Sequence, residues 1–77
     1  MNQKNIKQKG DNKNMANNYI IISSNGEYFG GWSRLGVMCM KSSGERSLAY
    51  RMSYTVAKRT LQKVEEFTHQ NCMVERI

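Results

Sequence analysis

Hydrophobic positions in this chain gather into patterned segments that begin near residue 19. The run Tyr19–Ile22 is β-branched and aromatic, and it is followed closely by Asn25-Gly26, a dipeptide typical of tight hairpin turns. Aromatic residues resume at 28–32, and a third apolar run covers 37–41. This pattern predicts a β-hairpin followed by a third strand.

The turn also predicts how the two hairpin strands pair. A two-residue loop at Asn25-Gly26 places Ile22 opposite Phe29, and Gly30-Gly31 then interrupts the second strand as a bulge or a close backbone approach. Because side chains alternate along a strand, the residues divide into two apolar faces, one with Ile20, Ile22 and Phe29 and the other with Tyr19, Ile21, Tyr28 and Trp32. We expect one face to be core and the other to be available.

The clearest element is a helix that follows Ser53, a good N-cap residue. Apolar residues recur at helical spacing along it, namely Tyr54, Val56, Ala57, Thr60, Leu61, Val64 and Phe67. The helix should end near Gln70-Asn71, because asparagine tolerates a left-handed cap. The segment before it, 47–52, fits either a short strand or an irregular lead-in, and 72–77 alternates like a last strand.

These elements predict an α+β fold, in which a hairpin, a third strand and a C-terminal strand form a small antiparallel sheet packed on one face by a single amphipathic helix. A single helix would leave the other sheet face open. Methionine is common on adaptable protein-binding surfaces, and some of the residues Met38, Met40, Met52 and Met73 should be exposed. The pattern therefore favours protein–protein association, including a homodimer through the open face.

Charge adds a second segment to this picture. The net charge is +6; residues 1–15 carry four lysines against one aspartate, and residues 16–77 carry eight basic against five acidic groups. We therefore expect residues 1–17 to form a disordered basic arm and 18–77 a single small domain. An AT-rich genome, or a true start at Met15, would also explain the arm. Neither a signal-peptide core nor a membrane-length apolar run is present, so we expect a cytoplasmic protein.

Candidate chemistry is sparse. Aspartate is absent after residue 11, so no Ser-His-Asp triad can form in the domain, and no pattern marks a paired acid and base; we expect no enzyme and no cofactor. His69 and Cys72 have metal-like spacing, Cys39 could approach them, and Glu75 could complete a set of four. The alternative, which we favour, is a histidine at a helix end and two small buried thiols, with no metal.

Three segments carry a resemblance to known proteins: NGEYFGGW, LAYRMSYTVAKRTL and CMVERI. Together they are similar to a class of very small phage and prophage proteins of low-GC bacteria. The resemblance covers about 60 residues, from Asn18 to Ile77. It implies a ββ(β)αβ fold and an accessory role in host takeover or anti-defence, and it assigns no functional residue.

Two functions follow from these observations. The first is a non-enzymatic, phage-type inhibitor that binds and occludes a host protein or nucleoprotein machine through Tyr28, Trp32, Arg34, Lys58, Arg59 and Lys63. The alternative is nucleic-acid binding, with bases stacked on Tyr28 and Trp32 and phosphates held by Arg34, Lys41, Arg51 and the arm residues Lys4, Lys7, Lys9 and Lys13. The helix charges run against the macrodipole, with Lys58 and Arg59 early and Glu65 and Glu66 late, which hints at a use other than stability.

Overall fold

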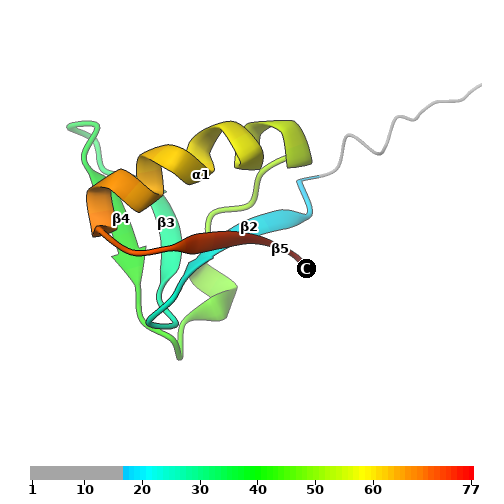
Figure 1. The fold of residues 1–77 in the computed structure, drawn as a ribbon, viewed down its shortest axis with the longest axis horizontal. Helices are drawn as coiled ribbons and strands as arrows, with labels where there is room; N and C mark the ends of the chain where they lie inside the picture. The colour runs from blue at the N-terminus through cyan, green and yellow to red at the C-terminus, as the bar shows by residue number, and fades with distance from the viewer. Residues whose placement is uncertain (1–16) are drawn as a thin grey trace, which may run out of the picture.

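The computed structural model describes residues 17–77, so the predicted arm lies outside the described residues apart from Asn17. Four antiparallel strands form one sheet in the order β4-β3-β2-β5, and one helix packs on it (Figure 1). The elements are β2 (Tyr19–Ser23), β3 (Tyr28–Trp32), β4 (Met38–Lys41), the short 3-10 helix η2 (Arg46–Leu48), α1 (Tyr54–Thr68) and β5 (Cys72–Arg76). The predicted α+β fold is confirmed.

The helix α1 begins where the sequence predicted and ends slightly earlier. The Ser53 hydroxyl accepts a hydrogen bond from the Val56 N–H at 3.3 Å, which satisfies one of the free donors of the first turn. The left-handed cap falls on His69 (φ 59°) rather than on Asn71. Its N–H returns to the Glu65 carbonyl at 2.8 Å, so the polypeptide leaves the helix before Gln70.

The β2–β3 hairpin does not have the predicted two-residue loop. The Ser23 N–H donates to the Glu27 carbonyl at 2.8 Å and the Gly26 N–H donates to the Ser23 carbonyl at 2.9 Å, which encloses three loop residues. Gly26 has φ +89°, but Asn25 is not left-handed; its side-chain oxygen instead accepts the Glu27 N–H at 3.0 Å. A type I turn with a glycine bulge therefore replaces the expected type I′ turn.

One additional loop residue shifts the hairpin register, so Ile22 lies opposite Tyr28 and not Phe29. A slip of one residue exchanges the two faces of a strand. Phe29 is consequently buried with Ile21 under α1, whereas Tyr28 joins Ile20 on the other face. The predicted division of the hairpin residues is wrong in this respect.

The bulge expected at Gly30-Gly31 is present and decides the position of Trp32. Phe29 pairs with Met40 and Trp32 pairs with Met38, so three steps along β3 match two along β4. The additional residue returns Trp32 to the same face as Phe29. Trp32 thus lies on the helix side of the sheet, together with both methionines.

The second sheet face is not left open as predicted. Figure 1 shows η2 on the opposite side of the sheet from α1, and Ala49, which follows η2, is buried with Ile20 and Tyr28. An ion pair of 3.6 Å joins Arg46 of η2 to Glu75 of β5. This segment gives the small sheet a second, minor core.

The ambiguous segment after η2 is an extended lead-in that fills a gap between β2 and β3. The Tyr50 N–H donates to the Phe29 carbonyl at 2.8 Å, and Met52 forms a bridge with Tyr19 through two backbone hydrogen bonds. Met52 is buried in the helix-side core, whereas Tyr50 stays partly exposed beside β3. Among residues 17–77, no helix is both long and apolar enough to cross a membrane.

Candidate interaction surface

The helix covers only part of the sheet face on which it packs. Its contacts are mainly with β2 and β5, and the far side of that face, formed by β3 and β4, is less protected. Phe29 is fully buried there, but its neighbours are partly exposed. We refer to the side chains of Trp32, Met38, Met40 and Tyr50 as the aromatic–methionine surface.

Trp32 and Tyr50 are the exposed centre of this surface. Their rings lie 5.6 Å apart and nearly perpendicular, and each makes a second edge-to-face contact with Phe29, at 5.0 Å and 5.9 Å respectively. Such contacts fix ring orientation beyond simple burial. Trp32 is 44% exposed and Tyr50 43%, so two large rings are held in place while their outer surfaces meet solvent.

Gly31 makes this arrangement possible. It has φ +87°, and a Cβ added there would lie 2.9 Å from Cδ1 of Tyr50. Only glycine combines this conformation with so close an approach. Gly31 therefore lets the Tyr50 ring close onto β3 beside Trp32.

The loop between β3 and β4 extends the surface at its tip. The Ser33 hydroxyl accepts hydrogen bonds from the N–H groups of Leu35 and Val37, each at 3.2 Å, and the Ser33 N–H donates to the Val37 carbonyl at 2.8 Å. These bonds order a loop whose side chains are exposed: Leu35 is 90% accessible, and Arg34 and Val37 also face solvent. An ordered loop that presents apolar side chains is suited to contact with another macromolecule.

The structure separates the predicted site residues. Tyr28 is only 8% exposed and packs beneath Ala49, so it cannot offer a ring face to a base or a partner; its assignment to either site is wrong. The cause is the shifted register, which places Tyr28 and Trp32 on opposite sides of the sheet. Trp32 and Arg34 remain together at the β3–β4 end, as predicted from their sequence positions.

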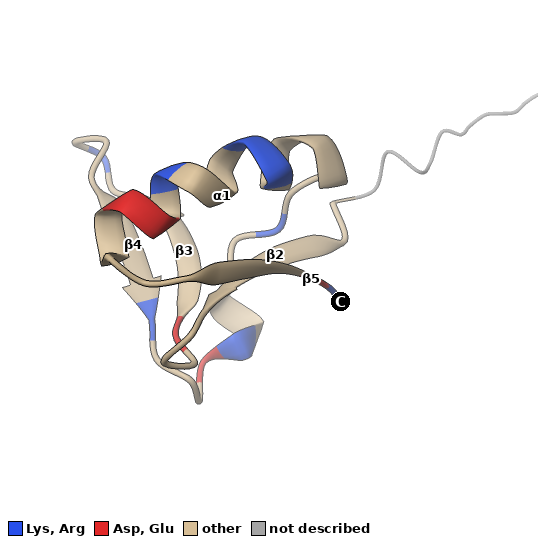
Figure 2. Cartoon of the chain, in the orientation of Figure 1, with Lys and Arg blue, Asp and Glu red and all other residues tan. Residues whose placement is uncertain are grey.

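The basic helix residues form a separate group. Figure 2 shows Lys and Arg along the first two thirds of α1 and Glu in its last turns. Lys58, Arg59 and Lys63 are exposed, and Nζ of Lys58 lies 6.0 Å from the centroid of the Tyr54 ring. Because α1 packs mainly on β2 and β5, these cations lie on a different element from the aromatic–methionine surface and do not form part of it.

Of the other cations predicted to hold phosphates, Lys41 and Arg51 lie within the described part of the chain. The stem of Lys41 lies across Gly30, where an added Cβ would meet its Cγ at 2.9 Å. Arg51 is exposed directly after Tyr50. The arm lysines Lys4, Lys7, Lys9 and Lys13 lie outside the described residues.

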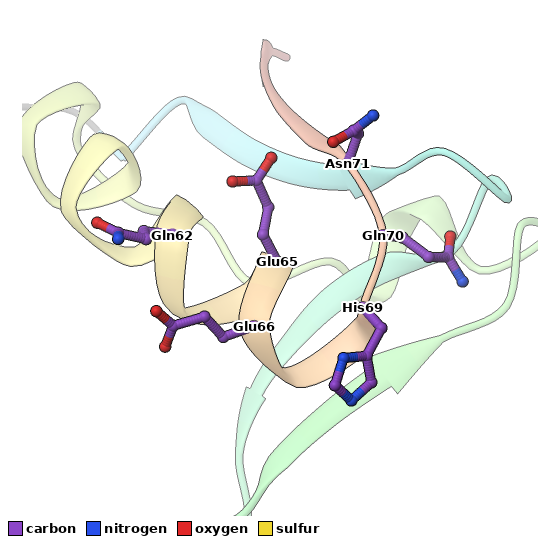
Figure 3. Close-up of a pocket in the computed structure, with 6 residues that line it drawn as sticks. All are labelled: Gln62, Glu65, Glu66, His69, Gln70 and Asn71. Carbon is purple, nitrogen blue, oxygen red and sulfur yellow. The ribbon is translucent and has the colours of Figure 1, made fainter.

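A shallow hollow of about 400 Å³ lies at the C-terminal end of α1 (Figure 3) and is lined by Gln62, Glu65, Glu66, His69, Gln70 and Asn71. Two of its polar side chains already hold the fold together. Glu65 Oε2 accepts the Cys72 N–H at 3.0 Å, and Gln70 Oε1 accepts from the Asn25 N–H and the Ser24 hydroxyl at 3.1 Å. These bonds tie the helix end to β5 and to the first hairpin, so we assign the hollow a structural role.

The possible metal ligands do not converge. Within residues 17–77, no three side chains of His, Cys, Asp or Glu are grouped as a metal ion requires. Cys39 lies on β4 and Cys72 on β5, the two opposite edges of the sheet. Cys72 packs into the helix-side core, where burial raises the pKa of its thiol.

Sequence reasoning missed the role of Tyr50, which lies in the segment whose structure was ambiguous. The available signal was Gly30-Gly31, since a glycine in a strand indicates a close approach by another group. The sequence could not show which group approached. Comparisons with protein-family models, curated proteins and solved structures found no match to this chain.

Proposed function

We propose that this protein is a non-enzymatic binding module of the phage accessory type, which occludes a host protein or nucleoprotein machine in the host cytoplasm. The observation that supports this best is the aromatic–methionine surface, where Trp32 and Tyr50 are rigidly held yet almost half exposed. Aromatic residues and methionine are enriched at the centres of protein interfaces. Rings that are ordered before binding lose little conformational entropy when a partner covers them.

The surroundings of these rings also support a protein-binding surface. Leu35 and Val37 add exposed apolar area at the adjoining loop, and Arg34 provides a cation at its rim. An apolar centre with a charged rim is the usual anatomy of a protein interface. Occlusion requires only such a surface and no catalytic group, which agrees with the scarcity of candidate chemistry in the sequence.

The test is a native pull-down from host lysate with three forms of the full chain. The surface variant combines Trp32→Ala and Tyr50→Ala. The matched control combines Leu48→Ala and Met73→Ala, which removes exposed apolar side chains from elsewhere on the molecule. We expect the wild type and the control to retain the same stoichiometric partner and the surface variant to lose at least ten-fold in recovery. Equal recovery by all three folded forms would refute this surface as the site.

Nucleic-acid binding remains a second candidate because of one structural observation. Each exposed ring has an exposed arginine close by in the chain, Arg34 after Trp32 and Arg51 after Tyr50. Aromatic rings with neighbouring cations are typical of single-strand binding. In that case affinity for a labelled oligonucleotide would fall steeply between about 50 and 200 mM salt, and deletion of residues 1–14 would weaken it further. Protein occlusion should instead survive both changes.

A further inference from the structure

The free edge of β4 deepens the proposed function, on which this inference rests. In the sheet order β4-β3-β2-β5, β4 is an edge strand. The Phe29 carbonyl accepts from Tyr50 and therefore points away from β4, so the Phe29–Met40 pair is of the non-hydrogen-bonded kind. The backbone N–H and C=O of Met40 consequently point outward, away from the sheet.

The same reasoning applies to Met38. Ser33 and Val37 are joined by a backbone hydrogen bond, so the next pair, Trp32 and Met38, is again non-hydrogen-bonded. Met38 and Met40 thus present two N–H and two C=O groups along one edge. In the described part of the chain, no other segment takes up these groups. Their side chains lie on the helix side, continuous with Trp32.

The opposite edge, β5, is partly protected. Val74 also points its N–H and C=O outward by the same pairing rule, but the first outward donor of this strand is capped and its end is charged. On β5, the outward N–H of Cys72 is accepted by the Glu65 carboxylate at 3.0 Å, and the strand ends in the charged pair Glu75-Arg76. Edge strands are normally protected by charges, prolines or covering segments. On β4 the one charged residue is Lys41, at its end, and the whole chain lacks proline. An apolar, uncapped edge beside an exposed aromatic pair is suited to strand addition.

Charge indicates what kind of strand would fit. Cations flank the edge at both ends, Arg34 in the loop before β4 and Lys41 at its last residue. Among residues 17–77, the salt bridge present joins Arg46 to Glu75, so neither flanking cation forms one with an acidic side chain of this part of the chain. The carboxylate of Glu45 accepts hydrogen bonds from the Ser42 N–H and hydroxyl at 3.0 Å. These bonds lower the pKa of Glu45, and the charge of Lys41 lowers it further without forming a salt bridge. A second copy of the chain would bring its own Arg34 and Lys41 to the same short edge, whereas an acidic segment would complement them.

We propose that the β4 edge binds an extended acidic segment of a partner protein by strand addition. Residues of that segment opposite Met38 and Met40 would be apolar and would continue the aromatic–methionine surface. Alternate residues, opposite Cys39 and Lys41, would be acidic. In the antiparallel arrangement, the apolar residues exchange hydrogen bonds with Met38 and Met40, and the acidic residues direct their N–H groups away.

The probe is a short synthetic peptide that alternates valine and glutamate, titrated into the 15N-labelled full chain and followed by NMR. The matched control alternates valine and lysine. We expect amide shifts centred on Met38 and Met40 and an affinity at least ten-fold higher for the acidic peptide. N-methylation of the valines should abolish binding and N-methylation of the glutamates should leave it nearly unchanged, because only one set faces the edge.

Two peptide results would overturn the proposal: no amide shift at Met38 and Met40 up to about 1 mM peptide, or an equal loss of affinity when the valines and when the glutamates are N-methylated. Two other results would also overturn it: dimerisation of the chain alone through the Met38 and Met40 amides, or the same amide shifts with a single-stranded oligonucleotide. Failure here is distinguishable from failure of the proposed function. If the peptide does not bind but the Trp32→Ala, Tyr50→Ala variant still loses its partner, the surface binds by another mode. If that variant keeps its partner, the aromatic–methionine surface is not the binding site, and if the wild type itself retains no partner, the proposed function is wrong.

Discussion

At the scale of single residues, two glycines on the β3–β4 hairpin share a positive φ but have different surroundings. Gly31 and Gly36 both have strongly positive φ, +87° and +81°. A Cβ at Gly31 would collide with the Tyr50 ring, whereas a Cβ at Gly36 would meet nothing within 4 Å. Comparing them separates the cost of the conformation from the cost of the lost space.

We expect Gly31→Ala to lower the free energy of unfolding by about 2 kcal/mol or more, because it combines left-handed strain with displacement of Tyr50. Gly36→Ala should cost only about 1 kcal/mol, from backbone strain alone. Urea denaturation of both variants measures the difference. If the two lose equal stability, the contact between Gly31 and Tyr50 does not hold the aromatic pair in place.

The two cysteines should differ in reactivity. Burial is the main cause that raises the pKa of the Cys72 thiol, with the nearby Glu65 carboxylate adding to it and a hydrogen bond with Thr68 opposing it. A raised pKa leaves less thiolate at pH 8, and the thiolate is the reactive form. We expect iodoacetamide to modify Cys39 before Cys72 in the native protein, as read by peptide mass spectrometry, and the preference to vanish in urea. Faster modification of Cys72 would contradict its position in the helix-side core.

At the scale of elements, the end of α1 combines a charge placement that the sequence made appear unfavourable with a left-handed cap on a residue other than glycine. Glu65 lies near the negative end of the helix dipole, but its carboxylate caps the first edge donor of β5. His69 takes the left-handed cap position although it is not glycine. The Glu65 position thus has a structural explanation and does not by itself indicate a functional site.

Replacing the cap residue tests where the helix ends. A non-glycine residue in the left-handed region carries a cost, so His69→Gly should raise the free energy of unfolding by about 0.5–1 kcal/mol. Asn71→Gly, at the position predicted from the sequence, should bring no gain. Thermal melts followed by circular dichroism would show both. A gain in stability from Asn71→Gly instead of His69→Gly would show that the helix ends at residue 71.

At the scale of the whole molecule, the second face of the sheet depends on a short segment with few anchors. The Ala49 side chain and the Arg46–Glu75 ion pair hold η2 against β2, β3 and β5. Both charged side chains are well exposed, at 45% and 39%. The apolar contact of Ala49 should therefore contribute more to the free energy of unfolding than the ion pair does.

A double-mutant cycle on Arg46→Ala and Glu75→Ala should give a coupling energy below about 0.5 kcal/mol, and less at high salt, because exposed pairs are screened and lose side-chain entropy. Ala49→Asp, which places a charge between Ile20 and Tyr28, should by contrast cost several times more. Chemical denaturation at two salt concentrations provides both values. A coupling energy above about 1 kcal/mol would show that the ion pair is a main source of stability for η2 on this face.

The sequence by itself determined the helix, the four strands and their order along the chain, but not the short 3-10 helix or the lead-in to α1. Ser53 and the apolar spacing of 54–67 suffice for the helix because capping and periodicity are local properties, and the β-branched and alternating runs likewise predict the strands. The α+β class follows from that order. Trp32 and Arg34 were placed together correctly because they are neighbours in the chain.

Tertiary structure decided which face each side chain joins. Asn25 could have taken a positive φ, but its side chain bonds Glu27 and Gln70 accepts its N–H, and the resulting three-residue loop exchanged Tyr28 and Phe29 between the faces. Tyr50 reaches Trp32 through a contact across 18 positions of sequence that no local pattern encodes. Both outcomes depend on contacts between groups that are far apart in the sequence. The candidate surface could therefore be identified only from the folded structure.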